Sequence, residues 1–189
     1  RQQAMTPGEV RIVGGLWKRS KLPVPQLEGL RPTPDRVRET LFNWLGQSLD
    51  GWHCVDPFAG TGALGFEAAS RGASRVWMAD TQALCVTALR ATQQRLAATQ
   101  VDIRQTDGLQ MLATLPQGEW DLVFLDPPYA YPAHEKALAL GRSLLKPQGW
   151  LYLEADKAWP EAVLASLGWA RERYLKAGSV HAHLLKPAA

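Results

Sequence analysis

Residues 126–129 read Asp-Pro-Pro-Tyr and directly follow the apolar run WDLVFL, which is typical of a buried strand. The prolines cannot extend that strand, because proline lacks the N–H that the ladder needs and fixes its own φ angle. Asp126 and the carbonyl of Pro127 can instead accept both hydrogens of an exocyclic amine, and Tyr129 offers a face on which an extruded base stacks. We therefore predict Asp126, Pro127, Pro128 and Tyr129 as the catalytic residues of an amine clamp, with an ordinary Asp-Pro turn as the alternative.

A second motif, VDPFAGTGALG, places Gly60, Gly62 and Gly65 in the spacing GxGxxG. Glycines let the backbone pass close to a ligand, and the N-terminus of the following helix offers free N–H groups. About twenty residues further on, Asp80 ends the next strand, where a carboxylate can accept hydrogen bonds from both hydroxyls of a ribose. The pattern indicates a nucleotide site, with a purely structural glycine turn as the alternative.

The neighbours of these glycines distinguish between two cofactors. Asp56 and Phe58 precede the glycines, and an anion there would repel the pyrophosphate of NAD but attract the sulfonium and ammonium groups of S-adenosylmethionine. Asp107 follows the third strand and can accept a hydrogen bond from the adenine amino group, with the Gly108-Leu109 backbone alongside the ring. We therefore expect S-adenosylmethionine. An NAD-dependent oxidoreductase is the alternative, and it would leave the proline motif unexplained.

Short apolar strands alternate with helical stretches from residue 52 onward. The helices are predicted over residues 63–71, 82–97, 109–115, 133–145 and 159–167. Five strand-helix repeats predict right-handed crossovers and a mainly parallel sheet that is covered on both faces. The tail WARERYLKAG then SVHAHLLK has no helix between its two strands, so the sheet should end in an antiparallel hairpin. Ligands bind beyond the carboxyl ends of strands in such sheets, which is where both motifs fall.

Basic residues are concentrated in the N-terminal fifth of the chain. Residues 1–38 hold eight Lys/Arg and three Asp/Glu, whereas the rest holds 13 and 15. The stretch RIVGGLWKRSKLPVP indicates a hairpin or extended arm, and its charge suits a phosphate backbone. A solvated tail is the alternative. We expect a basic arm over residues 1–32 and an α/β domain over residues 33–189.

A helix should follow the arm. Thr33 can cap this helix, Pro34 fits its first turn, and apolar residues then recur at helical spacing as far as Leu49. We expect Arg36 and Arg38 to lie near its N-terminus and away from the packed stripe.

Composition argues against several other classes of protein. The 189 residues suit one domain, and Cys54 and Cys85 are not in a CxxC pair, so both are expected to be reduced core residues. No apolar run reaches the roughly 18 residues of a membrane helix, and the N-terminus shows no signal-peptide pattern. We expect a soluble, cytoplasmic monomer without a membrane partner. No metal site is predicted, because no ligand spacing joins cysteine or carboxylate to His53, His134, His181 or His183.

The order VDPFAGTGALG, Asp80, Asp107, DPPY resembles that of the class I S-adenosylmethionine-dependent amino-methyltransferases. The N-terminal block RIVGGLWKRSKLPVP…GLRPTPDRVRETLFNWL narrows the resemblance to one family, because it closely resembles the bacterial ribosomal small-subunit methyltransferase D family. The match runs from Arg11 to the final hairpin. It implies methylation of the N2 amine of one guanine in 16S ribosomal RNA, within an assembled or assembling small subunit. It also implies a Rossmann-like seven-stranded sheet with an antiparallel last strand.

The resemblance assigns roles to individual residues as well. The implied cofactor-binding residues are Asp56, Phe58, Ala59, Gly60, Thr61, Gly62, Asp80, Asp107, Gly108 and Leu109. The implied RNA-binding residues are Arg11, Lys18, Arg19, Lys21, Arg31, Arg36 and Arg38. Thr33, Arg36 and Arg38 would lie beside the mouth of the site. Asp80 stands where Glu is frequent in the family, which should keep ribose binding, and WKRSKL lacks the glycine expected between its basic residues, which leaves the RNA contacts of the arm open.

The nearest rival keeps the chemistry and changes the substrate. DNA adenine-N6 and cytosine-N4 methyltransferases also use DPPY, but they usually carry a target-recognition domain for which this chain has no room. Several other ribosomal guanine-N2 methyltransferases prefer NPPF, so Asp126 favours the family named above. A catalytically silent RNA-binding module is disfavoured, because every catalytic motif position is intact.

Overall fold

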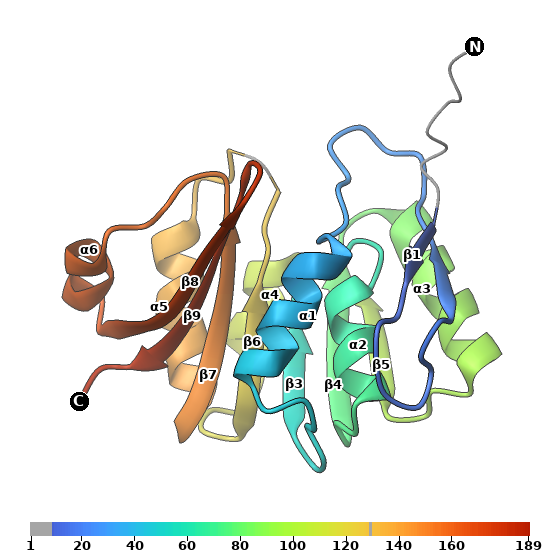
Figure 1. The fold of residues 1–189 in the computed structure, drawn as a ribbon, viewed down its shortest axis with the longest axis horizontal. Coiled ribbons are helices and arrows are strands. Elements are labelled where there is room, and N and C mark those ends of the chain that lie inside the picture. Colours follow the sequence, from blue (N-terminus) through green and yellow to red (C-terminus); the bar gives the residue numbers. More distant parts are fainter. Residues whose placement is uncertain (1–8, 129) are drawn as a thin grey trace.

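A computed structural model describes residues 9–128 and 130–189, and it is built on a seven-stranded sheet with helices on both faces (Figure 1). The strand order is β5-β4-β3-β6-β7-β9-β8, in which β5 to β7 are parallel and β9 runs antiparallel to both β7 and β8. The strands are β3 (His53–Asp56), β4 (Arg75–Asp80), β5 (Val101–Gln105), β6 (Trp120–Leu125), β7 (Leu145–Ala155), β8 (Trp169–Ala177) and β9 (Val180–Pro187). The predicted α/β fold and its antiparallel C-terminal hairpin are confirmed.

The helices predicted after residue 52 are all present, and their ends agree with the sequence pattern within two residues. The helices of the structure are α1 (Asp35–Trp44), α2 (Ala63–Ser70), α3 (Ala83–Leu96), α4 (Gly108–Thr114), α5 (His134–Leu144) and α6 (Glu161–Ser166). In the part of the chain that the structure describes, no helix combines the length and the apolar character needed to cross a bilayer.

The strands pack into two cores because successive side chains point to opposite faces of the sheet. On β6, Leu122 and Phe124 join one core with α1, α2 and α3, whereas Val123 and Leu125 join the other with α4, α5 and α6. Figure 1 shows α1 and α2 in front of the sheet and α4 and α5 behind it. The sheet thus fixes the carboxyl ends of five parallel strands at one edge of the domain.

The N-terminal segment forms the predicted hairpin, with β1 (Glu9–Arg11) antiparallel to β2 (Lys21–Pro23). Its apolar residues Val10, Ile12 and Leu22 are buried in the core that α1, α2 and α3 share. The hairpin therefore packs against the α/β domain along its length. The boundary at residue 32 stays a prediction.

Two expectations for the start of α1 are wrong. The helix begins at Asp35, no side chain caps it, and the Thr33 hydroxyl bonds to carboxyl groups elsewhere. Arg38 is fully buried and does not lie away from the packed stripe. Its guanidinium donates to the backbone carbonyls of Thr33 (3.1 Å) and Arg11 (2.9 Å), and pairs with Asp35 and Glu67. Arg38 is consequently unavailable to RNA.

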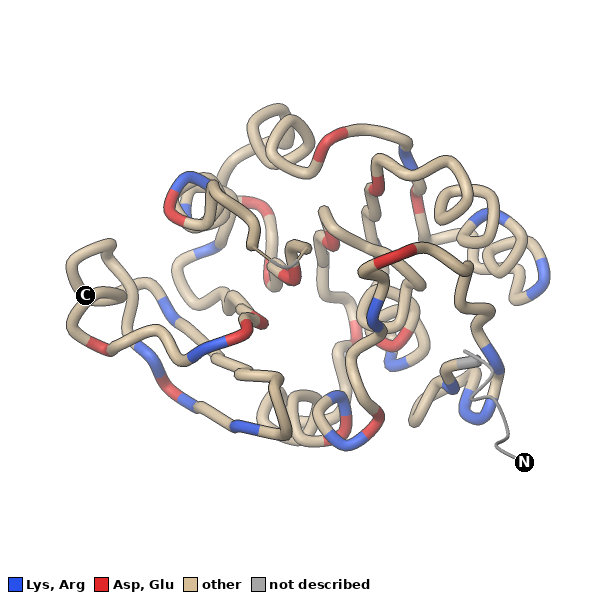
Figure 2. Tube along the Cα trace, turned by 90° about the horizontal axis from the view of Figure 1, so that it is seen from above, with Lys and Arg blue, Asp and Glu red and all other residues tan. Residues whose placement is uncertain are grey.

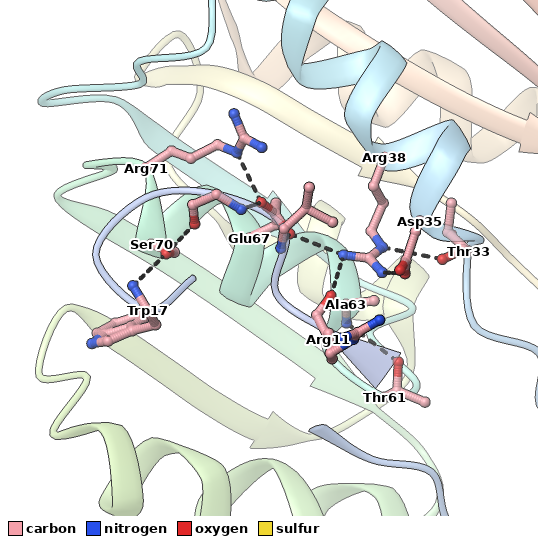
Figure 3. A network of polar contacts seen from close by, with 12 residues as sticks. Arg11, Trp17, Thr33, Asp35, Arg38, Thr61, Ala63, Glu67, Ser70 and Arg71 are labelled. Atoms are coloured by element: carbon pink, nitrogen blue, oxygen red, sulfur yellow. Dashed lines mark hydrogen bonds and ion pairs between the residues drawn. The ribbon is translucent and has the colours of Figure 1, made fainter. Parts of the chain in front are cut away.

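Glu67 on α2 is the centre of this buried network (Figure 3). Its Oε1 accepts hydrogen bonds from the Val13 amide and from Arg38, and its Oε2 accepts from the Gly14 amide and from Arg71, all at 2.9 Å. One carboxylate therefore fastens the hairpin and α1 to α2. Burial of both charges is tolerated because each finds charged and hydrogen-bonding partners.

Candidate active site

A cavity of about 930 Å³ opens at the carboxyl ends of the parallel strands. Figure 2 looks onto this end of the molecule. Its lining comes from residues 27–34, 57–61, 63–64, 80–82, 107–108, 126–128, 130–131, 154–156 and 177–180, with Cys85 and His134. Both sequence motifs therefore reach one cavity, as the parallel sheet predicts.

The glycine loop between β3 and α2 forms one wall of the cavity. Gly60 and Gly62 have φ angles of 55° and 84°, a conformation that side chains disfavour. A Cβ atom on Gly62 would also lie 2.6 Å from Leu89 and from Phe66. Glycine is thus required at position 62 both for its backbone conformation and for the space around it.

Asp56 lies beneath this loop and is buried. Its Oδ2 accepts a hydrogen bond from the Gly65 amide at 3.0 Å, whereas its Oδ1 has no partner among the described residues. Burial raises the pKa of Asp56 to about 7; the Gly65 hydrogen bond opposes this rise, and the charges of Asp80 and Glu154 add to it. A cation near this carboxyl group would supply the missing stabilisation.

Asp80 ties the glycine loop to the end of β4. One carboxylate oxygen accepts from the Gly60 amide and the other from the Gln82 amide, both at 2.9 Å. Because each carboxylate oxygen has two lone pairs, both can still accept from a ligand hydroxyl. Asp80 lines the cavity, so it remains available for the predicted ribose contact.

Asp107 and Gly108 form the next part of the wall. Asp107 is exposed and caps α4 by accepting from the Gln110 amide at 3.3 Å. A Cβ atom on Gly108 would lie 2.7 Å from the ring of Phe58, so glycine lets α4 pack closely against the loop after β3. Of the predicted cofactor residues, Asp56, Gly62 and Leu109 do not line the cavity, and the others do.

The proline motif follows β6, which lies next to β3 in the sheet, and forms another part of the wall. Asp126 is partly buried, and it lines the cavity with Pro127 and Pro128. The fourth predicted catalytic residue, Tyr129, lies outside the described residues. Tyr131 is an aromatic residue near the motif that the structure does describe, and it lines the cavity. Its ring centroid lies 5.2 Å from that of Phe58 and 5.5 Å from that of His134, in edge-on arrangements. The sequence analysis did not select Tyr131, although an aromatic residue two positions after the motif was visible.

A cluster of acids and hydroxyl groups connects this wall to β7. The Thr33 hydroxyl donates to Glu154 Oε1 at 2.8 Å and lies 3.4 Å from Asp126 Oδ2, and the Tyr152 hydroxyl also donates to Glu154 Oε1, at 2.7 Å. Burial, then the charges of Glu154 and Asp56, raises the pKa of Asp126 well above its usual range. Burial also raises the pKa of Glu154, against the hydrogen bonds from Tyr152 and Thr33.

Glu154 was missed by the sequence analysis, and a signal for it existed. Asp56, Asp80 and Asp126 each stand at or just after the end of a parallel strand, and Glu154 stands in the same place near the end of β7. An acid at the end of each neighbouring strand converges on one edge of the sheet. Extending that series by one strand would have found it.

The cavity is strongly acidic. Among the described residues that line it, Arg31 is the one Lys or Arg. The acids of the lining are Glu28, Asp80, Asp107, Asp126, Glu154 and Asp156. Such a lining focuses a negative potential into the cavity and favours a cationic ligand. Within the described residues, no group of three or more His, Cys, Asp and Glu is arranged to hold a metal ion.

The predicted RNA-binding residues other than Arg38 lie in two places. Arg31 lines the cavity and Arg36 is exposed in the first turn of α1. Those on the hairpin are all exposed, namely Arg11, Lys18, Arg19 and Lys21. The turn before Lys18 is held at the C-terminal end of α2, where the Leu16 and Trp17 amides donate to the carbonyl and hydroxyl of Ser70. The glycine loop lies at the other end of this eight-residue helix.

Comparison with known proteins supports one family. The family model described as Conserved hypothetical protein 95 matches residues 10–186. Ribosomal RNA small subunit methyltransferase D of Haemophilus influenzae is 43% identical over 159 residues, which cover 81% of this chain and 82% of that protein. A solved structure described as "Putative methyltransferase yhhF from Escherichia coli" is 34% identical, with a TM-score of 0.81, and the match covers 96% of this chain and 99% of that one.

A more distant solved structure shares the fold alone. The 1,6-didemethyltoxoflavin-N1-methyltransferase of Burkholderia thailandensis, solved with bound S-adenosylhomocysteine, is 13% identical, with a TM-score of 0.66 over 82% of this chain and 78% of that one. The fold is thus that of the class I methyltransferases. By the extent of the family match and the identity to its curated relative, the chain belongs to the Conserved hypothetical protein 95 family, that of ribosomal RNA small subunit methyltransferase D.

Proposed function

We propose that this chain transfers a methyl group from S-adenosylmethionine to the N2 amine of a guanine in 16S ribosomal RNA of the small subunit. The observation that carries the proposal is that the glycine loop and the Asp126-Pro127-Pro128 motif line one acidic cavity. The name of the Haemophilus influenzae relative supports ribosomal RNA as the substrate. The choice of guanine N2 depends on the family resemblance of the motifs.

The residues of the glycine-loop wall fit S-adenosylmethionine. Among the described residues, the buried Oδ1 of Asp56 has no partner, and the neighbouring cavity lining is acidic, so a ligand with sulfonium and ammonium charges would stabilise these carboxyl groups. Gly60 and Thr61 would lie along the methionine part, Asp80 would accept from the ribose, and Asp107 from the adenine. When bound, this cofactor supplies an electrophilic methyl group whose bond to sulfur breaks as the bond to the acceptor nitrogen forms.

The proline motif would orient the acceptor. The amine of guanine is a weak nucleophile, because its lone pair is delocalised into the ring. Asp126 and the Pro127 carbonyl would accept the two amine hydrogens and so point the nitrogen lone pair into the cavity. As the nitrogen gains positive charge, the Asp126 carboxylate stabilises it, and the proton then leaves to Asp126 or to water.

Basic residues outside the cavity would hold the RNA backbone. Arg31 lines the cavity and Arg36 is exposed in the first turn of α1, two residues after Pro34 of the lining, so both would neutralise phosphates next to the target nucleotide. The hairpin residues Lys18, Arg19 and Lys21 would bind a more distant part of the RNA. The acidic cavity repels phosphates, so a neutral base would enter it while the backbone stays outside.

The first experiment is transfer of labelled methyl from S-adenosylmethionine to small ribosomal subunits that lack the modification, followed by nucleoside mass spectrometry. We expect N2-methylguanosine at a single site. Asp126→Asn removes the carboxylate and keeps its size, so it should lower the rate by about 10²–10³-fold. Asp102→Asn, which changes a partly exposed acid on β5, is the matched control and should leave the rate unchanged.

Two results would redirect the assignment. Label in DNA as N6-methyladenine or N4-methylcytosine would keep the fold and the cofactor but replace the substrate. Absence of transfer to any nucleic acid, together with a change in NADH fluorescence on adding the protein, would support the oxidoreductase alternative.

A further inference from the structure

The acid and hydroxyl cluster beside the proline motif forms a continuous chain of hydrogen-bonding groups. It runs from Asp126 through the Thr33 hydroxyl to Glu154, with contacts of 3.4 and 2.8 Å. All three residues line the cavity, and Thr33 itself is 2% exposed. The chain therefore begins at the group that would hold the acceptor amine and ends at a second carboxyl group of the same cavity.

The contacts give this chain a direction. Glu154 Oε1 accepts from both Thr33 and Tyr152, so this oxygen is the acceptor end of the chain. A hydroxyl group has one hydrogen, and the shorter of the two contacts favours its donation to Glu154. Thr33 can also donate to an ionised Asp126 across the longer contact, and once Asp126 carries the amine proton, the Thr33 oxygen can accept from Asp126 instead.

The surroundings favour one shared proton on this chain. Asp56, at the end of β3, adds negative charge to Asp126, and Tyr152, on β7 itself, is fully buried. On the neighbouring strand β9, His183 bonds to the Leu153 carbonyl and the Trp159 amide instead of the cluster. No ion pair among the described residues includes Asp126 or Glu154. Two adjacent carboxyl groups without a cation hold tightly the first proton that either of them receives.

We propose that Thr33 and Glu154 are positioning residues that carry the proton of the reaction away from Asp126. This inference rests on the proposed function and decides between the two proton acceptors that it leaves open. The amine gives its proton to Asp126, Asp126 gives its proton to the Thr33 oxygen, and Thr33 passes its own hydrogen to Glu154 Oε1. Glu154 later releases the proton to water in the open cavity. Each O–H bond that breaks is matched by one that forms, and one proton leaves per methyl transferred.

The buried guanidinium of Arg38 keeps the relay in place. Its Nε donates to the Thr33 carbonyl at 3.1 Å, while Glu67 holds its Nη1 at 2.9 Å. The backbone of residue 33 is thereby fixed to α2. Because the Thr33 hydroxyl does not cap α1, it is free to contact the two carboxyl groups. A change of the Thr33 side chain alone should leave this backbone anchor intact.

The test compares the pH dependence of methyl transfer for the whole protein and three variants. Thr33→Val keeps the shape but removes the hydroxyl, so Asp126 loses a donor and the acid limb of the profile should move up by roughly one pH unit. Glu154→Gln removes the charge that keeps a proton on Asp126, so the acid limb should move down and the plateau rate should fall several-fold. Thr33→Ser retains the hydroxyl and should restore the wild-type profile.

These outcomes separate the relay from a structural role. Loss of packing alone would lower the rate of both variants without moving the acid limb in opposite directions, and an unmoved limb in both variants would overturn the inference. If the wild-type protein methylates no RNA, the proposed function fails. The titration of the ¹³C-labelled Asp126 carboxyl group, followed by NMR, then decides the relay on its own: opposite shifts in the two variants support it, and identical titrations in all proteins exclude it.

Discussion

Two acidic clusters in this molecule, one around Glu67 and one at the ends of the parallel strands, differ in how their charges are balanced. Glu67 lies between two arginines and two backbone amides, and all of these contacts are 2.9 Å long. The acids at the ends of β3, β6 and β7, namely Asp56, Asp126 and Glu154, take part in no ion pair among the described residues. Burial alone therefore does not mark a functional acid. The distinguishing feature is that the fold supplies the counter-charge in the first cluster and leaves it to a ligand in the second.

The largest loss of stability is expected when the first cluster loses its anion. Glu67→Gln would leave the Arg38 guanidinium buried with only Asp35 as a charged partner, and we expect a loss of about 3–5 kcal/mol in the free energy of unfolding. Denaturant unfolding measures this. The control is Asp102→Asn, which breaks the exposed pair with Arg104 and should cost under about 1 kcal/mol. Equal losses for the two variants would contradict the distinction between the clusters.

The second cluster should respond in the opposite direction. The pKa of Asp56 is raised to about 7 in the folded protein, so its stabilising contribution is complete below its unfolded value of 3.8 and is lost as the pH rises through 7. Asp56→Asn should therefore stabilise the ligand-free protein at pH 8, by up to about 4 kcal/mol, while it abolishes cofactor binding.

Unfolding at pH 8 and at pH 4, with S-adenosylhomocysteine titrations alongside, measures both effects. Little difference in stability is expected at pH 4, where the folded carboxyl group is protonated and the pH is only just above the unfolded value of 3.8. A variant that is less stable than the wild type at pH 8 would show that Asp56 is stabilised by the fold after all.

A buried histidine should show the corresponding effect of burial on a basic group. His183 is fully buried, and burial lowers its pKa to about 4, while the hydrogen bond with the Leu153 carbonyl opposes this fall. The neutral ring stabilises the fold above its unfolded pKa of 6.5, and this contribution falls as the pH drops from there toward 4, by up to about 3 kcal/mol.

Comparing the free energy of unfolding of wild type and His183→Gln from pH 7.5 to pH 4.5 tests this prediction. The wild type should lose more stability over that interval than the variant. Parallel pH curves would show that His183 does not contribute to the pH dependence of stability.

The smallest expected effect concerns the hairpin. Replacement of Lys18, Arg19 and Lys21 by Ala should leave stability nearly unchanged and should flatten the salt dependence of RNA binding, by up to about 0.7–0.9 in log–log slope for each phosphate that is no longer neutralised. Filter binding at several salt concentrations measures the slope. Arg31→Ala, at the cavity, is the matched comparison, and an unchanged slope in the triple variant would exclude the hairpin from RNA binding.

The two clusters also show where sequence patterns succeed and fail. Hydrophobic periodicity predicted the strands, and a parallel sheet then brought the acids of the motifs together without knowledge of any contact. Arg38 was misplaced because its charge suggested solvent, although it follows Val37 on the buried stripe of α1. Its inward position depends on Glu67, which lies 29 residues away on another helix. Glu154 was missed because its role depends on Thr33, 121 residues away, whose hydroxyl looked like a helix cap.

The attachment of the hairpin to α2 sets a spacing along the surface of the protein. The glycine loop lies at one end of α2 and the hairpin turn at the other, and an eight-residue helix is about 12 Å long. Because Glu67 and Ser70 hold the hairpin on α2, the distance between the glycine loop and the hairpin turn is fixed. An RNA that binds as we propose has to present its target base and its distant phosphates at a matching separation, so a folded RNA surface meets this requirement better than a short, flexible oligonucleotide.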